Sequence, residues 1–145
     1  MMKLQGIGVS NGIVIAQAFL LVDPHLTVEK QTIDNPDAEK KRLQQAISEA
    51  KHELERIHAQ TLTKLGKEEA SIFSAHLLVL QDPALEMEVY QKIDTNMNAE
   101  AALTEASAMF VQMFESMDDA YMRERAADIR DVSRRILAKL LQVEL

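Results

Sequence analysis

Apolar residues recur every three or four positions through most of this chain, from about residue 36 to residue 142. Five apolar residues of the first such stretch fall on one helix face: Leu43, Ile47, Ala50, Leu54 and Ile57. Asn35 offers a capping side chain before Pro36 at the first helical position, and Gly66 is a typical C-terminal stop. The pattern therefore predicts one long amphipathic helix that ends at Gly66.

A proline divides the next apolar stretch into two short helices. The first is expected from about Lys67 to Gln81. It ends at Asp82, because a residue that precedes a proline avoids helical backbone angles. Asp82 and Pro83 then open a second helix that runs to about Asp94. We therefore expect two short helices that meet at a bend.

Two further long helices complete the pattern. Asn98 can cap the first of them, and Asp118 with Asp119 can start the second. Their apolar faces consist of Leu103, Ala106, Phe110, Met113 and Met117 in the first, and Met122, Ile129, Val132, Ile136 and Leu140 in the second. Short connections favour antiparallel neighbours. The predicted fold class is thus mostly α, a helical bundle of three long helices plus a bent short pair.

The first 22 residues differ from the rest. Residues 4–22 read as extended structure with an Asn-Gly turn, and residues 13–22 are apolar on both faces of a strand. No second strand-rich stretch follows, so this β segment is expected to belong to a sheet that residues 1–145 do not complete; a hairpin packed on the helices is the alternative. The predicted domains are 1–22, a connector at 23–34, and a helical domain at 35–145.

The stretch from Gly66 to Glu88 carries more apolar residues than one core face needs. Acidic residues surround this surplus: Glu68, Glu69, Asp82, Glu86 and Glu88. An apolar patch with an acidic rim is typical of a docking site for a basic, partly apolar protein surface. The alternative is a helix that is apolar all round because it is wedged between two others.

The overall charge narrows the choice of partners. The formal net charge is -7 and the isoelectric point is near 5.1, which argues against nucleic acid or an anionic membrane as the main ligand. No apolar run approaches the length of about eighteen residues that would span a bilayer. The absence of cysteine removes disulfides and thiolate metal sites. A basic protein partner is the natural complement.

No catalytic or metal-binding constellation stands out. The histidines at positions 25, 52, 58 and 76 have no metal-ligand spacing, and the chain has no phosphate-binding or nucleophile motif. His76 lies among apolar residues, where a half-buried histidine without a task is the simplest interpretation. On the last helix, Asp119 with Arg123 and Asp131 with Arg135 are spaced for i, i+4 ion pairs.

Three segments together resemble enzyme I of the bacterial phosphoenolpyruvate-dependent sugar phosphotransferase system. They are GIGVSNGIVIAQAFLL near the start, SIFSAHLLVLQDPALE at 71–86, and MFESMDDAYMRERAADIRDVSRRIL at 113–137. The resemblance implies that the helical part is the docking domain for the phosphocarrier HPr, inserted after the first strands of a phosphohistidine α/β domain. It also implies that this chain is an N-terminal fragment.

The resemblance assigns the HPr-facing positions to the second and third predicted helices and to one residue of the last. They are Glu68, Glu69, Ser71, His76, Leu78, Val79, Asp82, Leu85, Glu86 and Arg125. The family often has further acids where this chain has Lys67, Ser74 and Ala84. The electrostatic part of docking is therefore expected to be weaker here or to move to Glu69 and Glu88.

The same resemblance bears on activity. The family's phosphorylated histidine stands in a GGRTSH-type motif that these residues lack, so no catalytic residue is assigned and the chain alone should not phosphorylate itself. No cofactor is expected in these residues, while magnesium is implied for the full-length family member. The implied location is cytoplasmic.

Two further expectations are independent of catalysis. A freestanding helical interaction module without a tie to phosphoryl transfer is the rival hypothesis, and a titration with HPr separates the two. Residues 4–22 leave a two-sided apolar strand uncovered, so we expect copies of the chain to self-associate through its edge. A hairpin folded onto the bundle is the alternative to that pairing.

Overall fold

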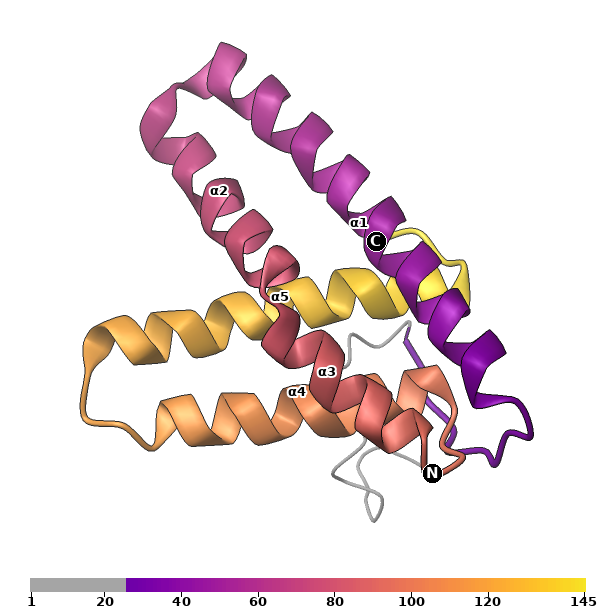
Figure 1. Ribbon diagram of the computed structural model, residues 1–145. Coiled ribbons are helices and arrows are strands. Elements are labelled where there is room, and N and C mark those ends of the chain that lie inside the picture. The colour runs from indigo at the N-terminus through magenta and orange to yellow at the C-terminus, as the bar shows by residue number, and fades with distance from the viewer. Residues whose placement is uncertain (1–25) are drawn as a thin grey trace, which may run out of the picture.

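Five helices make up the described part of the chain, residues 26–145 of a computed structural model (Figure 1). They are α1 (Pro36–Leu65), α2 (Lys67–Gln81), α3 (Pro83–Ile93), α4 (Ala99–Glu115) and α5 (Ala120–Leu141). The predicted helical bundle of three long helices and a bent short pair is confirmed for these residues. The predicted β segment at 4–22 and its predicted self-association fall outside the described residues, so both stay predictions.

Local signals set most of the helix ends. The Asn35 side chain accepts a hydrogen bond from the Ala38 backbone N–H at 3.1 Å, and Pro36 occupies the first position of α1. Gly66 ends α1 with a φ of 99°, which favours glycine over any residue with a side chain. Asp119 accepts from the Tyr121 N–H at 2.9 Å and so starts α5. These ends agree with the sequence prediction.

The helices form two antiparallel hairpins that cross. In Figure 1, α1 runs against α2 and α3, while α4 runs against α5, and the second hairpin passes across the first. The largest fully buried side chains come from both hairpins: Leu43, Leu54, Val89, Ile93, Leu103, Val132, Ile136 and Leu137. One hydrophobic core therefore joins the hairpins. No helix within residues 26–145 is long and apolar enough to cross a membrane.

Small residues let α4 approach α5 closely. Ala99, Ala102 and Ala106 on α4 are fully buried. Near them, Ser107 Oγ lies 2.6 Å from Ser133 Oγ of α5, so each buried hydroxyl has a partner. A pair of hydrogen-bonded serines costs little in an apolar core, whereas either serine alone would be an unsatisfied polar group.

Asn98 occupies the predicted N-cap position of α4 but does not cap the helix with its side chain. Its Oδ1 accepts from the Gln31 N–H at 2.8 Å, and its Nδ2 donates to the Glu29 carbonyl at 3.0 Å. The N–H of Ala99 is instead satisfied by Glu39 of α1, at 2.7 Å. The expected local cap is therefore replaced by contacts that hold the connector and α1 to the start of α4.

Both predicted i, i+4 ion pairs on α5 are wrong. Arg123 pairs with Asp118 at 3.2 Å, because Asp119 is engaged as the cap of α5. Arg135 reaches across to Glu53 of α1 at 2.6 Å, where Lys139 contributes a second cation at 2.8 Å. A half-buried carboxylate that accepts two charged donors outcompetes an exposed pair along one helix.

Candidate functional site

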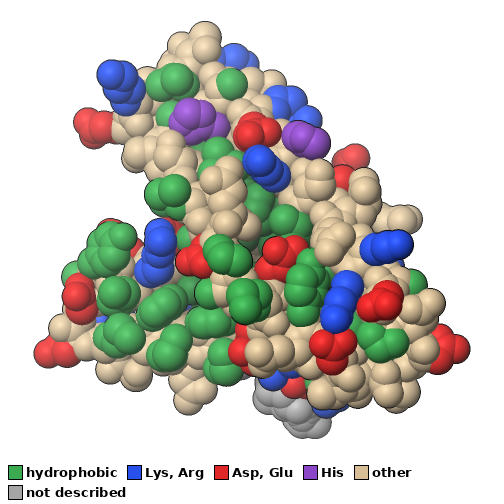
Figure 2. Space-filling model, viewed as in Figure 1, with side chains coloured by type: hydrophobic (Ala, Val, Ile, Leu, Met, Phe, Trp, Pro, Cys, Tyr) green, Lys and Arg blue, Asp and Glu red, His purple; other side chains and the backbone are tan. Residues whose placement is uncertain are grey.

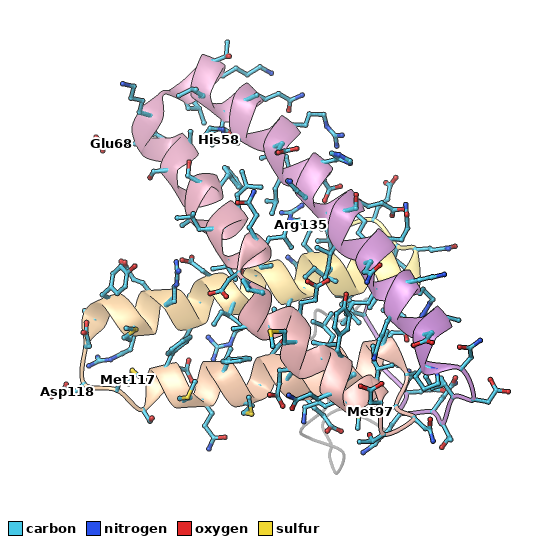
Figure 3. All side chains as sticks on the ribbon, in the orientation of Figure 1. His58, Glu68, Met97, Met117, Asp118 and Arg135 are labelled. Carbon is cyan, nitrogen blue, oxygen red and sulfur yellow. The ribbon has the colours of Figure 1, made fainter. Side chains whose placement is uncertain are left out.

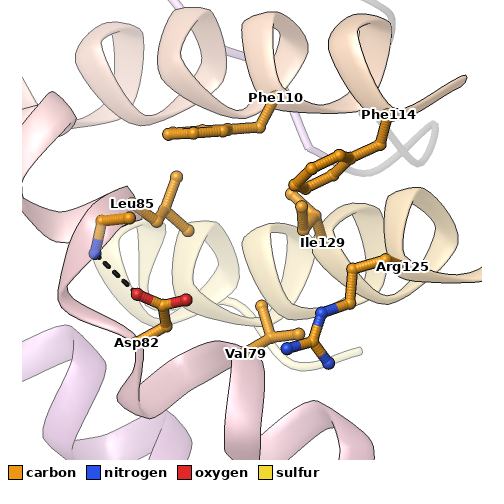
Figure 4. Close-up of a pocket in the computed structure, with 8 residues that line it drawn as sticks. Val79, Asp82, Leu85, Phe110, Phe114, Arg125 and Ile129 are labelled. Atoms are coloured by element: carbon orange, nitrogen blue, oxygen red, sulfur yellow. Dashed lines mark hydrogen bonds between the residues drawn. The ribbon is translucent and has the colours of Figure 1, made fainter. Parts of the chain in front are cut away.

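A shallow groove lies where the junction of α2 and α3 faces α4 and α5 (Figure 4). It is lined by Val79, Asp82, Ala84, Leu85, Phe110, Phe114, Arg125 and Ile129, which we call the groove residues. Its cavity volume is about 70 Å³, whereas pockets for small molecules usually measure roughly 300–1,000 Å³. A space of that size accepts one partner side chain, so the groove suits protein docking better than binding of a metabolite.

The bend between α2 and α3 forms one wall of the groove. Asp82 Oδ1 accepts the Ala84 N–H at 2.9 Å, and Pro83 occupies the first position of α3. This cap fixes the first turn of α3, and Leu85 then points toward the wall formed by α4 (Figure 4). The local sequence Asp-Pro thus does more than end α2, because it also turns an apolar side chain into the groove.

Two aromatic residues of α4 form the opposite wall. Phe110 and Phe114 are one helical turn apart, with ring centroids 6.4 Å apart and planes tilted by 31°. Sequence reasoning placed Phe110 on the apolar face of this helix but assigned neither residue to the site. The signal was present, since the i, i+4 aromatic pair lies next to Met109 and Met113 and gives α4 more apolar surface than one core face requires.

Apolar side chains remain exposed around the groove. Leu78 of α2 is 61% exposed, and Met87, Met113, Met117 and Tyr121 are exposed as well. Figure 2 shows hydrophobic side chains gathered over the α4 and α5 hairpin, below a notch that separates it from α2. The exposure of Leu78 contradicts the alternative of a wedged, fully buried α2. A patch of this kind marks an interaction surface.

Acidic residues flank one side of this surface. Glu68 and Glu69 are exposed in the first turn of α2, and Asp82 is exposed at its end. In Figure 3, Glu68 near the tip of the first hairpin and Met117 at the tip of the second lie toward the same side of the molecule. The acidic first turn of α2 and the apolar residues at the turn between α4 and α5 therefore lie on the same side of the molecule.

Two of the predicted rim acids already have partners inside the protein. Glu86 accepts a hydrogen bond from the Tyr90 hydroxyl at 2.7 Å, and Glu88 lies 3.8 Å from Lys92. Burial raises the pKa of Tyr90, and the hydrogen bond to Glu86 adds to that rise. Glu68, Glu69 and Asp82 consequently offer the more available negative charge for a partner.

His76 points away from solvent. It is 5% exposed, and its Nε2 lies 3.4 Å from Asp128 Oδ1 and 3.6 Å from Asp131 Oδ2 of α5. Phe73 packs edge-on against the imidazole, with centroids 6.0 Å apart. Burial raises the pKa of Asp128, although the charges of His76 and Arg125 oppose this shift.

The ten residues predicted to face a partner separate into three groups in the structure. Those that line the groove are Val79, Asp82, Leu85 and Arg125. Those exposed on α2 are Glu68, Glu69, Ser71 and Leu78. His76 and Glu86 are instead engaged within the protein. The structure thus brings four predicted residues together and adds Ala84, Phe110, Phe114 and Ile129 to them.

Magnesium was implied only for a longer family member. Within residues 26–145, no group of three or more histidine or carboxylate side chains is placed as a metal site would need. The groove itself offers only the carboxylate of Asp82, which already accepts a backbone hydrogen bond. The described residues do not fit a magnesium site.

Comparison with known proteins places this geometry in context. Residues 5–125 match the family model described as "PEP-utilising enzyme, N-terminal". The chain is 56% identical over its whole length to phosphoenolpyruvate-protein phosphotransferase of Bacillus subtilis and 53% identical to that of Priestia megaterium. It covers 26% and 25% of those proteins, so it spans about a quarter of the curated relatives it matches.

Two solved structures share the fold. An NMR solution structure of an enzyme I protein superimposes with a TM-score of 0.78 at 34% identity, over 82% of this chain and 49% of the other. An N-terminal domain of a nitrogen enzyme I gives a TM-score of 0.73 at 30% identity, over 79% and 48% of the two chains. The crossed helical hairpins are therefore found in related proteins.

Proposed function

The chain belongs to the N-terminal family of PEP-utilising enzymes, and from that membership we propose that its groove docks the phosphocarrier HPr. The resemblance to enzyme I found in the sequence is confirmed by the relatives and by the solved structures. HPr docking, a role in sugar uptake and a cytoplasmic location are the parts that we add as proposals. We also propose the division of the chain into a β segment at 1–22, a connector at 23–34 and a docking domain at 35–145.

One observation carries this proposal, namely an apolar space of side-chain size next to a helix whose first turn is acidic. The groove is lined mainly by aliphatic and aromatic side chains, and Glu68 and Glu69 lie farther along α2. A buried apolar anchor at the centre of an interface supplies most of the affinity, while charges at the rim steer the encounter. A small basic protein that presents an apolar side chain fits both features.

The role of the groove in phosphoryl transfer would be positional. In full-length family members, phosphoryl passes from a histidine of the enzyme to a histidine of HPr. A docking surface that orients HPr converts a bimolecular step into one of high effective concentration. Electrostatically steered association of moderate affinity then lets the phosphorylated carrier leave.

An NMR titration tests the docking proposal. Adding HPr to the labelled chain should shift the resonances of Leu78, Asp82, Leu85 and Phe114 and leave those of His52 on α1 unchanged, because His52 lies outside the groove. Shifts confined to α1, or none at millimolar HPr, would contradict docking at the groove. The latter result would favour the rival hypothesis of a helical interaction module unrelated to phosphoryl transfer.

A second expectation concerns catalysis. None of His25, His52, His58 and His76 stands in a Thr-Ser-His context, and His76 is buried against α5. We expect residues 1–145 incubated with labelled phosphoenolpyruvate and magnesium to acquire no acid-labile label. Label on any of the four histidines would show that these residues carry a phosphorylation site of their own.

A further inference from the structure

A buried contact joins the two walls of the groove one helical turn away from it. His76 and Val79 are three residues apart on α2, and Arg125 and Asp128 are three residues apart on α5. Val79 and Arg125 line the groove, whereas His76 and Asp128 face each other across the helices at 3.4 Å. Residues three apart on a helix lie on one face. The contact and the groove therefore lie on the same two facing surfaces.

We propose that His76 is a positioning residue which, through Asp128, sets the spacing between the α2 and α5 walls of the groove. The inference rests on the proposed docking function, because the spacing matters only if a partner side chain enters. It replaces the role that the sequence resemblance gives His76, which is direct contact with the partner.

The burial of His76 supports this change of role. Its Nε2 is inaccessible to solvent and makes no hydrogen bond of good geometry, so its polar neighbours are the two carboxylates of α5. Phe73 packs on the ring from the same helix. The orientation of the imidazole is thus determined inside the protein, and its buried nitrogen has no path to a docked partner.

The carboxylate of Asp128 is partly buried, and packing alone does not explain why a charged group stands there. The pKa of Asp128 is raised, because desolvation, together with the charges of Asp131 and Glu124, disfavours the charged carboxylate more than His76 and Arg125 stabilise it. Replacing buried charges by neutral groups of similar volume is often neutral or stabilising. A role of Asp128 in fixing the distance between α2 and α5 accounts for its charged side chain at this position.

Three substitutions in the 145-residue chain test the positioning role. His76→Leu keeps apolar bulk but removes both ring nitrogens, whereas His76→Gln returns an amide nitrogen near the place of Nε2. Asp128→Asn removes the charge from the other side of the contact, and its side chain is 20% exposed, so folding should survive. His52→Leu, at an exposed position of α1, is the matched control.

Two readouts separate positioning from simple structural support. The first is the set of methyl shifts of Val79, Leu85 and Ile129 in the free protein, which report the groove walls. The second is the dissociation constant for purified HPr. His76→Leu and Asp128→Asn should each shift the methyl signals and raise the dissociation constant roughly two- to 150-fold, the range of coupling between residues in contact.

Comparison of the variants tests whether His76 positions the groove walls or only supports the fold. His76→Gln should restore the methyl shifts and bring binding to within about two-fold of wild type, the tolerance expected when coupling is retained. The double variant His76→Leu with Asp128→Asn should bind no more weakly than the weaker single variant. Asp128→Asn should not lower the melting temperature at pH 7, although it weakens binding.

Contrary results have distinct meanings. If both His76 variants weaken binding while the methyl shifts stay at wild-type values, His76 contacts the partner and the positioning role is wrong. If His76→Leu and Asp128→Asn change neither readout, the contact has no role in the groove. A wild-type chain that fails to bind HPr refutes the docking proposal, whereas the methyl shifts of the free variants still decide whether His76 sets the groove.

Discussion

Two regions of this protein use the same kinds of residue in opposite ways. At the crossing, which we define by Leu43, Leu54, Leu103, Val132 and Ile136, every one of these apolar side chains is at most 1% exposed. Beside the groove, Leu78 and Met113 are 61% and 42% exposed. Both regions are built from helices of the two hairpins, so the difference lies in the size of the side chains that those helices bring together.

The approach of the helices follows from the size of the residues between them. At the crossing, alanines and a hydrogen-bonded serine pair allow α4 and α5 to pack closely. Toward the turn between α4 and α5, phenylalanine and methionine replace the small residues. Bulky side chains facing the bent α2 and α3 pair leave a gap that no residue within 26–145 fills. Stability should therefore depend on the crossing and partner binding on the groove.

A core truncation at the crossing should give the largest effect. Leu103→Ala removes a side chain that is 1% exposed, and such a change costs about 2–5 kcal/mol of unfolding free energy, because a cavity remains. Urea unfolding followed by circular dichroism measures this loss. The dissociation constant for HPr, measured well below the denaturation midpoint, should stay near the wild-type value. A large loss of affinity in the folded variant would show that the two regions are not separable.

A truncation in the groove should weaken binding of HPr and leave the unfolding free energy nearly unchanged, and the change in free energy should be smaller than that of the core truncation. Leu85→Ala removes an apolar anchor from the groove and should weaken HPr binding by about 1 kcal/mol or more, as truncation at the centre of an interface commonly does. Lys67→Ala, at an exposed position at the start of α2, should change affinity much less. Isothermal titration calorimetry of both variants decides. Equal effects of the two substitutions would argue that the groove is not the centre of the interface.

Much of the fold could be predicted from the sequence because its signals are local. Asn35 with Pro36, Gly66, and Asp82 with Pro83 each set a helix boundary through a backbone preference or a cap within a few residues. The apolar surplus of α2 also indicated a surface for a partner, with a helix wedged between two others as the alternative that the exposure of Leu78 excludes. Neither inference requires knowledge of which helix lies opposite.

The features that the sequence did not predict depend on how the hairpins cross. Asn98 binds the connector rather than capping α4, and Arg135 pairs with Glu53, 82 residues away, rather than with Asp131 one turn away. Phe114 lines the groove only because the second hairpin folds back toward α3. His76 turns inward for the same reason. Periodicity gives the face of each residue but not its partner.

The smallest expected effect is the pH dependence of stability that one carboxylate contributes in each region. Glu53, near the crossing, is held by Lys139 and Arg135 at 2.8 Å and 2.6 Å. Burial alone would raise its pKa, but these hydrogen bonds and charges together hold the pKa of Glu53 below its usual value of 4.5. Asp128, beside the groove, has its pKa raised by burial. The two carboxylates should therefore respond to pH with opposite signs.

For Glu53, a lowered pKa in the folded state means that the folded protein binds the proton less readily than the unfolded chain. Its stabilising contribution is therefore complete above about pH 4.5, the usual value, and is lost as the pH falls through the lower folded-state pKa. The difference in unfolding free energy between wild type and Glu53→Gln should shrink as the pH falls from 7 to 3. Asp118→Asn, a change at a fully exposed carboxylate, is the control and should show little pH-dependent difference.

For Asp128→Asn the trend should reverse, since the charged form of a carboxylate with a raised pKa is the less stable one. The unfolding free energy of the variant should therefore rise relative to that of wild type as the pH rises. A Glu53→Gln difference that stays constant across this range would mean that Lys139 and Arg135 do not favour its charged form in solution, and the contrast between the two regions would then rest on packing alone.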